Sequence, residues 1–197
     1  MKKDAVLKLS MISLMAALSY VAFTYLKINI PLPGGSTAFH LGNTFCVLAA
    51  LLMGGVPGGL AGAIGMSLAD IMDPLYINVA PKTMFLKFMI GLVTGILAHK
   101  VFKIRKLEGK DLTLKVVLSA AGGMAFNVIG EPLFGYLYYQ FILNMPDKAV
   151  NTLMKFNALT TGVNAILAVI IATILYLALY KRFKNSEVMK RLSPENE

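Results

Sequence analysis

The stretch from Leu41 to Ala69 reads LGNTFCVLAALLMGGVPGGLAGAIGMSLA and contains no charged residue. A helix needs about 20 apolar residues to cross a hydrocarbon core about 30 Å thick, so this stretch is too long for one untilted span. Its centre, Gly54-Gly55-Val56-Pro57-Gly58-Gly59, combines one proline with four glycines, which interrupt helices. We therefore predict two short membrane helices joined by a tight turn.

Four further apolar runs lie outside this stretch and bring the predicted number of membrane spans to six. One precedes it and three follow it, and they cover Leu9–Leu26, Met84–Ala98, Leu112–Leu143 and Phe156–Tyr180. The first run follows three lysines, as a signal peptide would. No small-residue cleavage site precedes Tyr25, however, and more spans follow, so we interpret this run as a retained membrane helix.

The composition of the 197-residue chain agrees with a membrane protein. Hydrophobic residues make up 57% and charged residues 15%, with a mean hydropathy of +0.69. A soluble domain contains about 25% charged residues. The single cysteine, Cys46, excludes a disulfide scaffold, and the apolar content excludes a disordered chain. The formal net charge of +9 raises the question of nucleic acid, which the positions of the basic residues answer.

The basic residues favour six spans over five. With six spans and a cytoplasmic N-terminus, 14 of the 19 Lys and Arg lie on the cytoplasmic side, as the positive-inside rule requires. If Leu41–Ala69 were one helix, the better orientation would place 12 against 7. We predict an all-α integral membrane protein, a six-transmembrane-helix bundle with both termini cytoplasmic. Residues 1–184 form a single membrane domain and residues 185–197 a short cytoplasmic tail. The basic runs then meet the lipid bilayer and not nucleic acid.

Ionisable and amide residues inside the spans are the first candidates for a site, because such groups are costly in a membrane. Asn127 and Glu131 are four residues apart and share a helix face. Glu131 contacts a ligand, or else it forms a structural hydrogen bond or an ion pair with Lys87. Asp70 lies at the predicted outer end of the third span, and Lys87 lies within the fourth.

A second group of polar residues lies near the predicted outer ends of two other spans. His40 and Asn43 begin the second span, without a second histidine, cysteine or acid at ligand spacing, so we expect no metal site. Asn157, Thr160, Thr161 and Asn164 form a polar face on the last span. Such a face either lines a cavity or holds helices together.

Small residues on the first helix suggest a contact surface. Ser13, Ala16 and Ala17 form a stripe that allows close approach of another helix, either within the bundle or from a separate membrane protein. The chain contains no Gly-x-x-x-x-Gly-Lys-Ser/Thr loop and no nucleophile elbow. We therefore expect no catalytic residues, no cofactor and no ATP hydrolysis by this chain.

Several motifs together resemble the S components of energy-coupling-factor (ECF) vitamin transporters, in the riboflavin-transporter-like branch. They are Leu41-Gly42-Asn43, the run from Leu52 to Gly62, Gly65-Met66-Ser67-Leu68-Ala69-Asp70, Ala80-Pro81-Lys82-Thr83, Gly91-Leu92-Val93-Thr94-Gly95 and Gly130-Glu131. The resemblance covers about Leu7 to Tyr180.

This resemblance implies a subunit that binds one vitamin on the extracellular side of the cell membrane. It also implies a membrane coupling (T) subunit and two cytosolic ATPase subunits, which would use the ATP. The stripe Ser13, Ala16 and Ala17 would dock the coupling subunit. The loop from Ile28 to His40 would close over the ligand.

The ligand is left open among flat heterocycles such as pyridoxine, hydroxymethylpyrimidine and riboflavin. Aromatic side chains would stack on the ring and polar side chains would bond its edge. The predicted substrate-binding residues are Glu131, Asn127, Lys87, Asp70, His40, Asn43, Tyr76, Tyr136, Tyr139, Asn157, Thr161 and Asn164. Two alternatives are a membrane scaffold or assembly protein without transport activity, and an intramembrane enzyme that uses Glu131 or Asp70 as acid or base.

Overall fold

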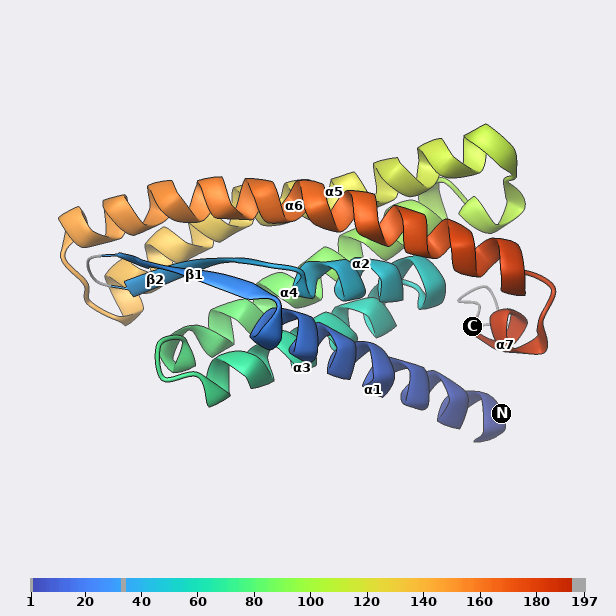
Figure 1. Ribbon diagram of the computed structural model, residues 1–197, viewed down its shortest axis with the longest axis horizontal. Helices are drawn as coiled ribbons and strands as arrows, with labels where there is room; N and C mark the ends of the chain where they lie inside the picture. The colour runs from blue at the N-terminus through green and yellow to red at the C-terminus, as the bar shows by residue number, and fades with distance from the viewer. Residues whose placement is uncertain (1, 33–34, 193–197) are drawn as a thin grey trace.

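The computed structural model describes residues 2–32 and 35–192 and is a bundle of helices with one two-stranded sheet (Figure 1). The elements in chain order are α1 (Lys2–Tyr25), β1 (Lys27–Leu32), β2 (Gly35–His40), α2 (Gly42–Met53), α3 (Gly55–Met72), η1 (Ile77–Val79), α4 (Ala80–Gly95), η2 (Ile96–Val101), η3 (Ile104–Lys106), α5 (Gly109–Leu137), η4 (Tyr138–Ile142), α6 (Asp147–Phe183) and α7 (Glu187–Arg191).

The predicted division of the long apolar stretch into two helices is confirmed. Gly54 separates α2 from α3 with a φ of 95°, a left-handed conformation that favours glycine. Beyond this turn the two helices run antiparallel, since a Cβ on Gly58 would lie 2.4 Å from Ala50 Cα and one on Gly62 would lie 2.3 Å from Cys46 Sγ. Pro57 lies in the first turn of α3, where its missing N–H removes no helical hydrogen bond.

Five helical stretches are long and apolar enough to cross a membrane. They are Asp4–Tyr25, Gly55–Met72, Ile77–Val101, Gly109–Ile142 and Asp147–Phe183. The sixth apolar helix, α2, has 12 residues, which at 1.5 Å per residue is about 18 Å and shorter than the hydrocarbon core. Six membrane crossings and the cytoplasmic position of both termini stay predictions.

The segment between α1 and α2 is a β-hairpin, so the expectation of an all-α chain is wrong here. β1 and β2 are antiparallel, with Lys27 opposite His40 and Leu32 opposite Gly35. Pro33 and Gly34, between the strands, lie outside the described residues. Helical periodicity cannot signal this hairpin, because its stability comes from pairing between strands and from packing on the helices. In Figure 1 the hairpin extends along α6 toward the start of that helix.

Part of the predicted tail packs against the bundle. Met189 of α7 is buried, and Arg105 donates hydrogen bonds to Met189 O at 2.9 Å and to Leu52 O at 2.6 Å. Arg191 Nε also lies 3.6 Å from Asp4 Oδ1, so α7 and the start of α1 lie at the same end of the bundle (Figure 1). Residues 193–197 of this tail lie outside the described residues.

The inner helix α2 positions the rest of the bundle. Eleven of its 12 residues are buried, and it packs against α1, α3, α4 and α6. On the far side of α3, the backbones of α3 and α4 touch. A Cβ on Gly91 would lie 2.2 Å from Gly59 N, and one on Gly95 would lie 2.1 Å from Gly55 N. Close backbone contact of this kind is a common means of helix association in membranes.

Replacing Gly91 with alanine tests the contact between α3 and α4. The added methyl group forces the two backbones apart, so we expect the free energy of unfolding in detergent to fall by about 1–3 kcal/mol. Gly162 of α6 is the matched control, because a Cβ there would have no atom within 4 Å. Gly162→Ala should leave stability unchanged or raise it by up to about 1 kcal/mol through better helix propensity. Equal losses for both variants would show that the close contact does not hold these helices together.

Candidate functional site

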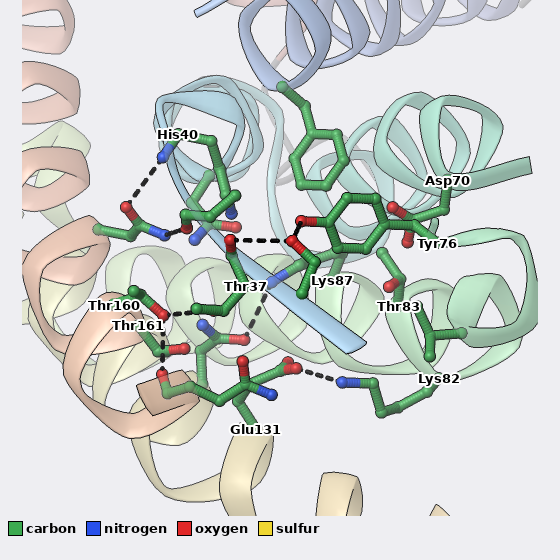
Figure 2. A pocket seen from close by; sticks show the side chains of 18 of the residues that line it. Thr37, His40, Asp70, Tyr76, Lys82, Thr83, Lys87, Glu131, Thr160 and Thr161 are labelled. Atoms are coloured by element: carbon green, nitrogen blue, oxygen red, sulfur yellow. Dashed lines mark hydrogen bonds and ion pairs between the residues drawn. The ribbon is translucent and has the colours of Figure 1, made fainter. Parts of the chain in front are cut away.

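A polar cavity lies where the hairpin meets the helices, and Figure 2 shows its lining side chains. Its volume is about 70 Å³. The hairpin contributes one wall, and α2 to α6 contribute the others. The lining residues are Phe23, Ser36, Thr37, Ala38, His40, Asn43, Asp70, Tyr76, Val79, Lys82, Thr83, Lys87, Asn127, Glu131, Tyr139, Asn157, Thr160, Thr161 and Asn164.

The structure brings 11 of the 12 predicted substrate-binding residues to this cavity. The exception is Tyr136, which packs against an apolar cluster that includes Tyr76 and Tyr139. The shared cavity explains why polar residues recur near one end of several helices. Whether these residues bind a substrate is a separate question from this placement.

Sequence reasoning missed several lining residues, of which Lys82 is the most important. A lysine at the start of a membrane helix usually reaches toward the headgroups, so we did not predict Lys82 as a residue that lines a site. Thr160 belongs to the polar face predicted on the last span, since it lies three residues after Asn157 and four before Asn164. Thr37 gave no signal, because the hairpin itself was not predicted.

Glu131 forms an ion pair with Lys82, whereas the sequence analysis named an ion pair with Lys87 as one alternative to ligand contact. In Figure 2 the Lys82 ammonium faces the Glu131 carboxylate across the cavity edge, with the side chains 5% and 15% exposed. The Lys82 ammonium also lies 5.5 Å from the centre of the Tyr139 ring. Lys87 instead donates to Asn127 Oδ1 at 3.3 Å. The two lysines therefore have different partners, although both come from α4.

The hairpin wall of the cavity is held to α6 by side-chain hydrogen bonds. Asn164 Oδ1 accepts from the His40 backbone N–H at 3.0 Å, while Asn164 Nδ2 donates to Ala38 O at 3.0 Å. The hydroxyls of Thr37 and Thr160 lie 2.7 Å apart. A single asparagine thus satisfies both a donor and an acceptor of β2, which fixes the end of the hairpin over the cavity.

Contacts on the opposite side hold the hairpin to the end of α3. Lys27 Nζ lies 2.6 Å from Asp73 Oδ2 and 4.9 Å from the Tyr76 ring centre. Burial, the largest single influence, raises the pKa of Asp73. The hydrogen bonds from Lys27 and from the Leu75 backbone N–H, together with the charge of Lys27, outweigh it and lower that pKa below its usual value. The Tyr76 hydroxyl donates to Ser36 Oγ, 2.9 Å away. The hairpin is therefore anchored on two sides.

His40 is neutral in this structure. Burial, and next the positive charge of Lys87, lower the pKa of His40 to about 3. Its Nδ1 accepts from the Gly42 backbone N–H at 3.2 Å, and its ring packs edge-on against Phe23 with centres 4.6 Å apart. These contacts fix His40 between β2 and α2, and its side chain also lines the cavity.

The predicted docking stripe divides into two faces. Ser13 and Ala17 are exposed on α1, whereas Ala16 is 7% exposed and faces Gly65 of α3. Ala16 therefore packs inside the bundle, because α1 turns this side toward α3. Ser13 and Ala17 are the members of the stripe that another protein can reach.

Comparison with known proteins identifies the family. The family described as "ECF-type riboflavin transporter, S component" matches residues 3–181. An uncharacterised protein in the gap 3′ region of Pyrococcus woesei is 32% identical over 75 residues, which are 38% of this chain and 49% of that protein. The chain thus matches about half the length of this curated relative, and no solved structure matches it. The family is one of transporter components and not of enzymes, and the five apolar helices agree with a multi-pass membrane protein. Because the match covers nearly the whole chain, this protein belongs to the family of ECF-type riboflavin transporter S components.

Proposed function

We propose that this protein is the membrane-embedded substrate-binding subunit of an ECF-type importer. It captures a water-soluble vitamin or related micronutrient, a flat heterocycle such as pyridoxine, hydroxymethylpyrimidine or riboflavin, on the extracellular side. The observation that carries the proposal is the polar cavity between the hairpin and the helices. Two acids, Asp70 and Glu131, and two lysines, Lys82 and Lys87, line it within membrane-spanning helices. Ionisable groups at such positions are costly and usually serve function.

The size of the cavity supports a binding site that closes over its ligand. A volume of about 70 Å³ has room for a few water molecules. Pockets for small-molecule ligands are about 300–1,000 Å³. In this proposal the hairpin is the wall that moves, because only side-chain contacts hold it to α6, Asp73 and Tyr76 among the contacts described, and no helix continues through it. Its displacement would admit a ring, and its return would exclude water.

The proposed partners follow from the family and from the exposed face of α1. We expect a membrane coupling subunit at Ser13 and Ala17, and two cytosolic ATPase subunits that bind and hydrolyse the ATP. This chain itself would need no cofactor. The proposed location is the bacterial cytoplasmic membrane.

The purified protein should retain its ligand, and mass spectrometry of small molecules released on denaturation should identify it. Thermal unfolding with a vitamin panel provides the second measurement, because a ligand at 100 times its Kd adds about 2.7 kcal/mol of stability. If no small molecule is released and no vitamin raises the unfolding temperature, the importer proposal is wrong. Turnover of a bound compound by the isolated chain would favour the enzyme instead.

Asn164→Ala should speed release of the ligand that the panel identifies. The substitution removes two hydrogen bonds to β2 and costs the closed hairpin about 1–3 kcal/mol, which corresponds to dissociation about 5–150 times faster. Stopped-flow measurement of dissociation tests this. Thr152→Ala, on the same helix, is the control, because the Thr152 hydroxyl bonds only to Lys148 O among the contacts described. Unchanged dissociation in Asn164→Ala would rule out the hairpin as the closing wall.

Ala17→Phe should weaken co-purification with the coupling subunit and leave vitamin affinity unchanged. A bulky side chain prevents the close helix approach that a small residue permits. Ile166→Phe is the matched control, because Ile166 is exposed on α6, across the bundle from α1 (Figure 1). Loss of vitamin affinity in Ala17→Phe, or equal loss of co-purification in both variants, would argue against docking on α1.

A further inference from the structure

The surface where α5 packs against α6 contains two hollows, one apolar and one basic. The first, which we call the apolar groove, has a volume of about 540 Å³ and lies within the membrane-spanning parts of both helices. Met124 and Ala165 are its buried floor, while Ile129 and Ile166 are exposed at its edges. The groove is open at Gly162, where an added Cβ would have no atom within 4 Å. All the residues that line it are apolar.

The second hollow, which we call the basic hollow, lies between the same helices at the end of the bundle where α1 begins and α7 lies (Figure 1). Its volume is about 400 Å³, and its lining includes Glu108, Leu177, Lys181 and Lys184. Lys184 Nζ lies 2.7 Å from Glu108 Oε1, but both side chains are exposed, and exposed ion pairs are weak. Two lysines line the hollow with one acid, so its net charge is positive.

The spacing of the two hollows matches the depth of one membrane leaflet. Ile166 precedes Lys181 by 15 residues on α6, and Lys110 precedes Ala125 by 15 residues on α5. At 1.5 Å per residue, each of these distances is about 22 Å. A bilayer with its headgroups is about 40–45 Å thick, so one leaflet is about 20–22 Å deep. A lipid with its headgroup at the lysines therefore has acyl chains long enough to reach the apolar groove.

The apolar groove requires an occupant that the membrane can supply. Its lining offers water no hydrogen bonds, and an empty groove would cost its lining the dispersion contacts of a filled one. The proposed coupling subunit would dock on α1, which packs against α2 and α3, whereas α5 and α6 lie across the bundle from α1 (Figure 1). Docking on α1 would therefore leave the groove in contact with lipid.

We propose that the surface between α5 and α6 binds one anionic phospholipid. An acyl chain lies in the apolar groove, and the headgroup phosphate accepts hydrogen bonds from Lys181 and Lys184. Basic pockets between membrane helices attract anionic headgroups in this way. A choline headgroup would bring a positive charge beside the lysines, so the basic hollow favours an anionic lipid over a zwitterionic one. This site is separate from the polar cavity and does not rest on the proposed function.

Native mass spectrometry of the purified full chain tests the specificity for the headgroup. The probes are phosphatidylglycerol and phosphatidylcholine with identical acyl chains, each added to protein from which lipid has been removed. We expect one phosphatidylglycerol per chain, bound about fivefold more tightly than phosphatidylcholine or better. Equal affinities for the two lipids overturn the proposal. Inorganic phosphate that binds as tightly as phosphatidylglycerol also overturns it, because the acyl chain would then contribute nothing.

Lys181→Gln tests the basic hollow. This variant should bind phosphatidylglycerol about fivefold more weakly and phosphatidylcholine with unchanged affinity. Arg182→Gln is the matched control, because it removes the same charge from the next residue, which lies about half a turn around α6 from Lys184 and does not line the hollow. It should leave both affinities unchanged. Equal losses in the two variants would show only general attraction to the basic end of the bundle and would overturn the proposal.

Ala125→Leu tests the apolar groove. Ala125 is exposed and lines the groove, so the larger side chain should occupy the space of the acyl chain and weaken both lipids alike, without lowering the unfolding temperature of the lipid-free protein. Ala178→Leu, at an exposed position of α6 that does not line the groove, should leave both affinities unchanged. Unchanged lipid binding in Ala125→Leu overturns the proposal.

The same variant distinguishes a lipid from a second copy of this chain. If the unmodified protein has the mass of a dimer and Ala125→Leu has that of a monomer, a second copy occupies the groove and the lipid proposal is wrong. If Ala125→Leu does not fold, the comparison of Lys181→Gln with Arg182→Gln decides alone.

Discussion

Close contact between helix backbones is the constraint on which the rest of this structure depends. The hydrophobic effect does not drive helices together in a bilayer, so close packing and polar contacts must hold them. Gly58 and Gly62 bring α3 against α2, and Gly59 and Gly91 bring α4 against α3. The short helix α2 is enclosed as a result, and its first turn carries Asn43 to the cavity. Through these contacts, α2, α3 and α4 bring Asn43, Asp70 and Lys87 to one cavity.

The cavity concentrates polar groups that a membrane-spanning bundle otherwise avoids. Its charges balance, with Asp70 and Glu131 against Lys82 and Lys87. The Lys82–Glu131 pair needs no ligand, since each group compensates the other, and removal of one partner would leave an expensive buried charge. Among the described residues, neither amide atom of Asn43 has a hydrogen-bond partner, and neither does Asp70 Oδ1. One cavity thus contains a compensated ion pair and polar atoms that the described chain leaves without a partner.

The two ends of the bundle have different characters. At the cavity end, the hairpin is held to α6 by side-chain hydrogen bonds and to the end of α3 by the ion pair between Lys27 and Asp73. At the other end, Arg105 donates hydrogen bonds to carbonyl oxygens of α2 and α7. The cavity end is thus closed by side-chain contacts of a hairpin, whereas the opposite end is tied together through backbone carbonyls of helices.

The sequence by itself determined the helices, the turn at Gly54 and the residues that share a helix face. These follow from the length of apolar runs, the conformation that glycine permits and the period of 3.6 residues per turn. Only the tertiary structure decided that Glu131 pairs with Lys82, that Ala16 faces inward and that a hairpin covers the cavity. Those features depend on how helices rotate and cross and on pairing between strands. Contacts between distant segments set such geometry, and the local sequence pattern of any one segment does not contain it.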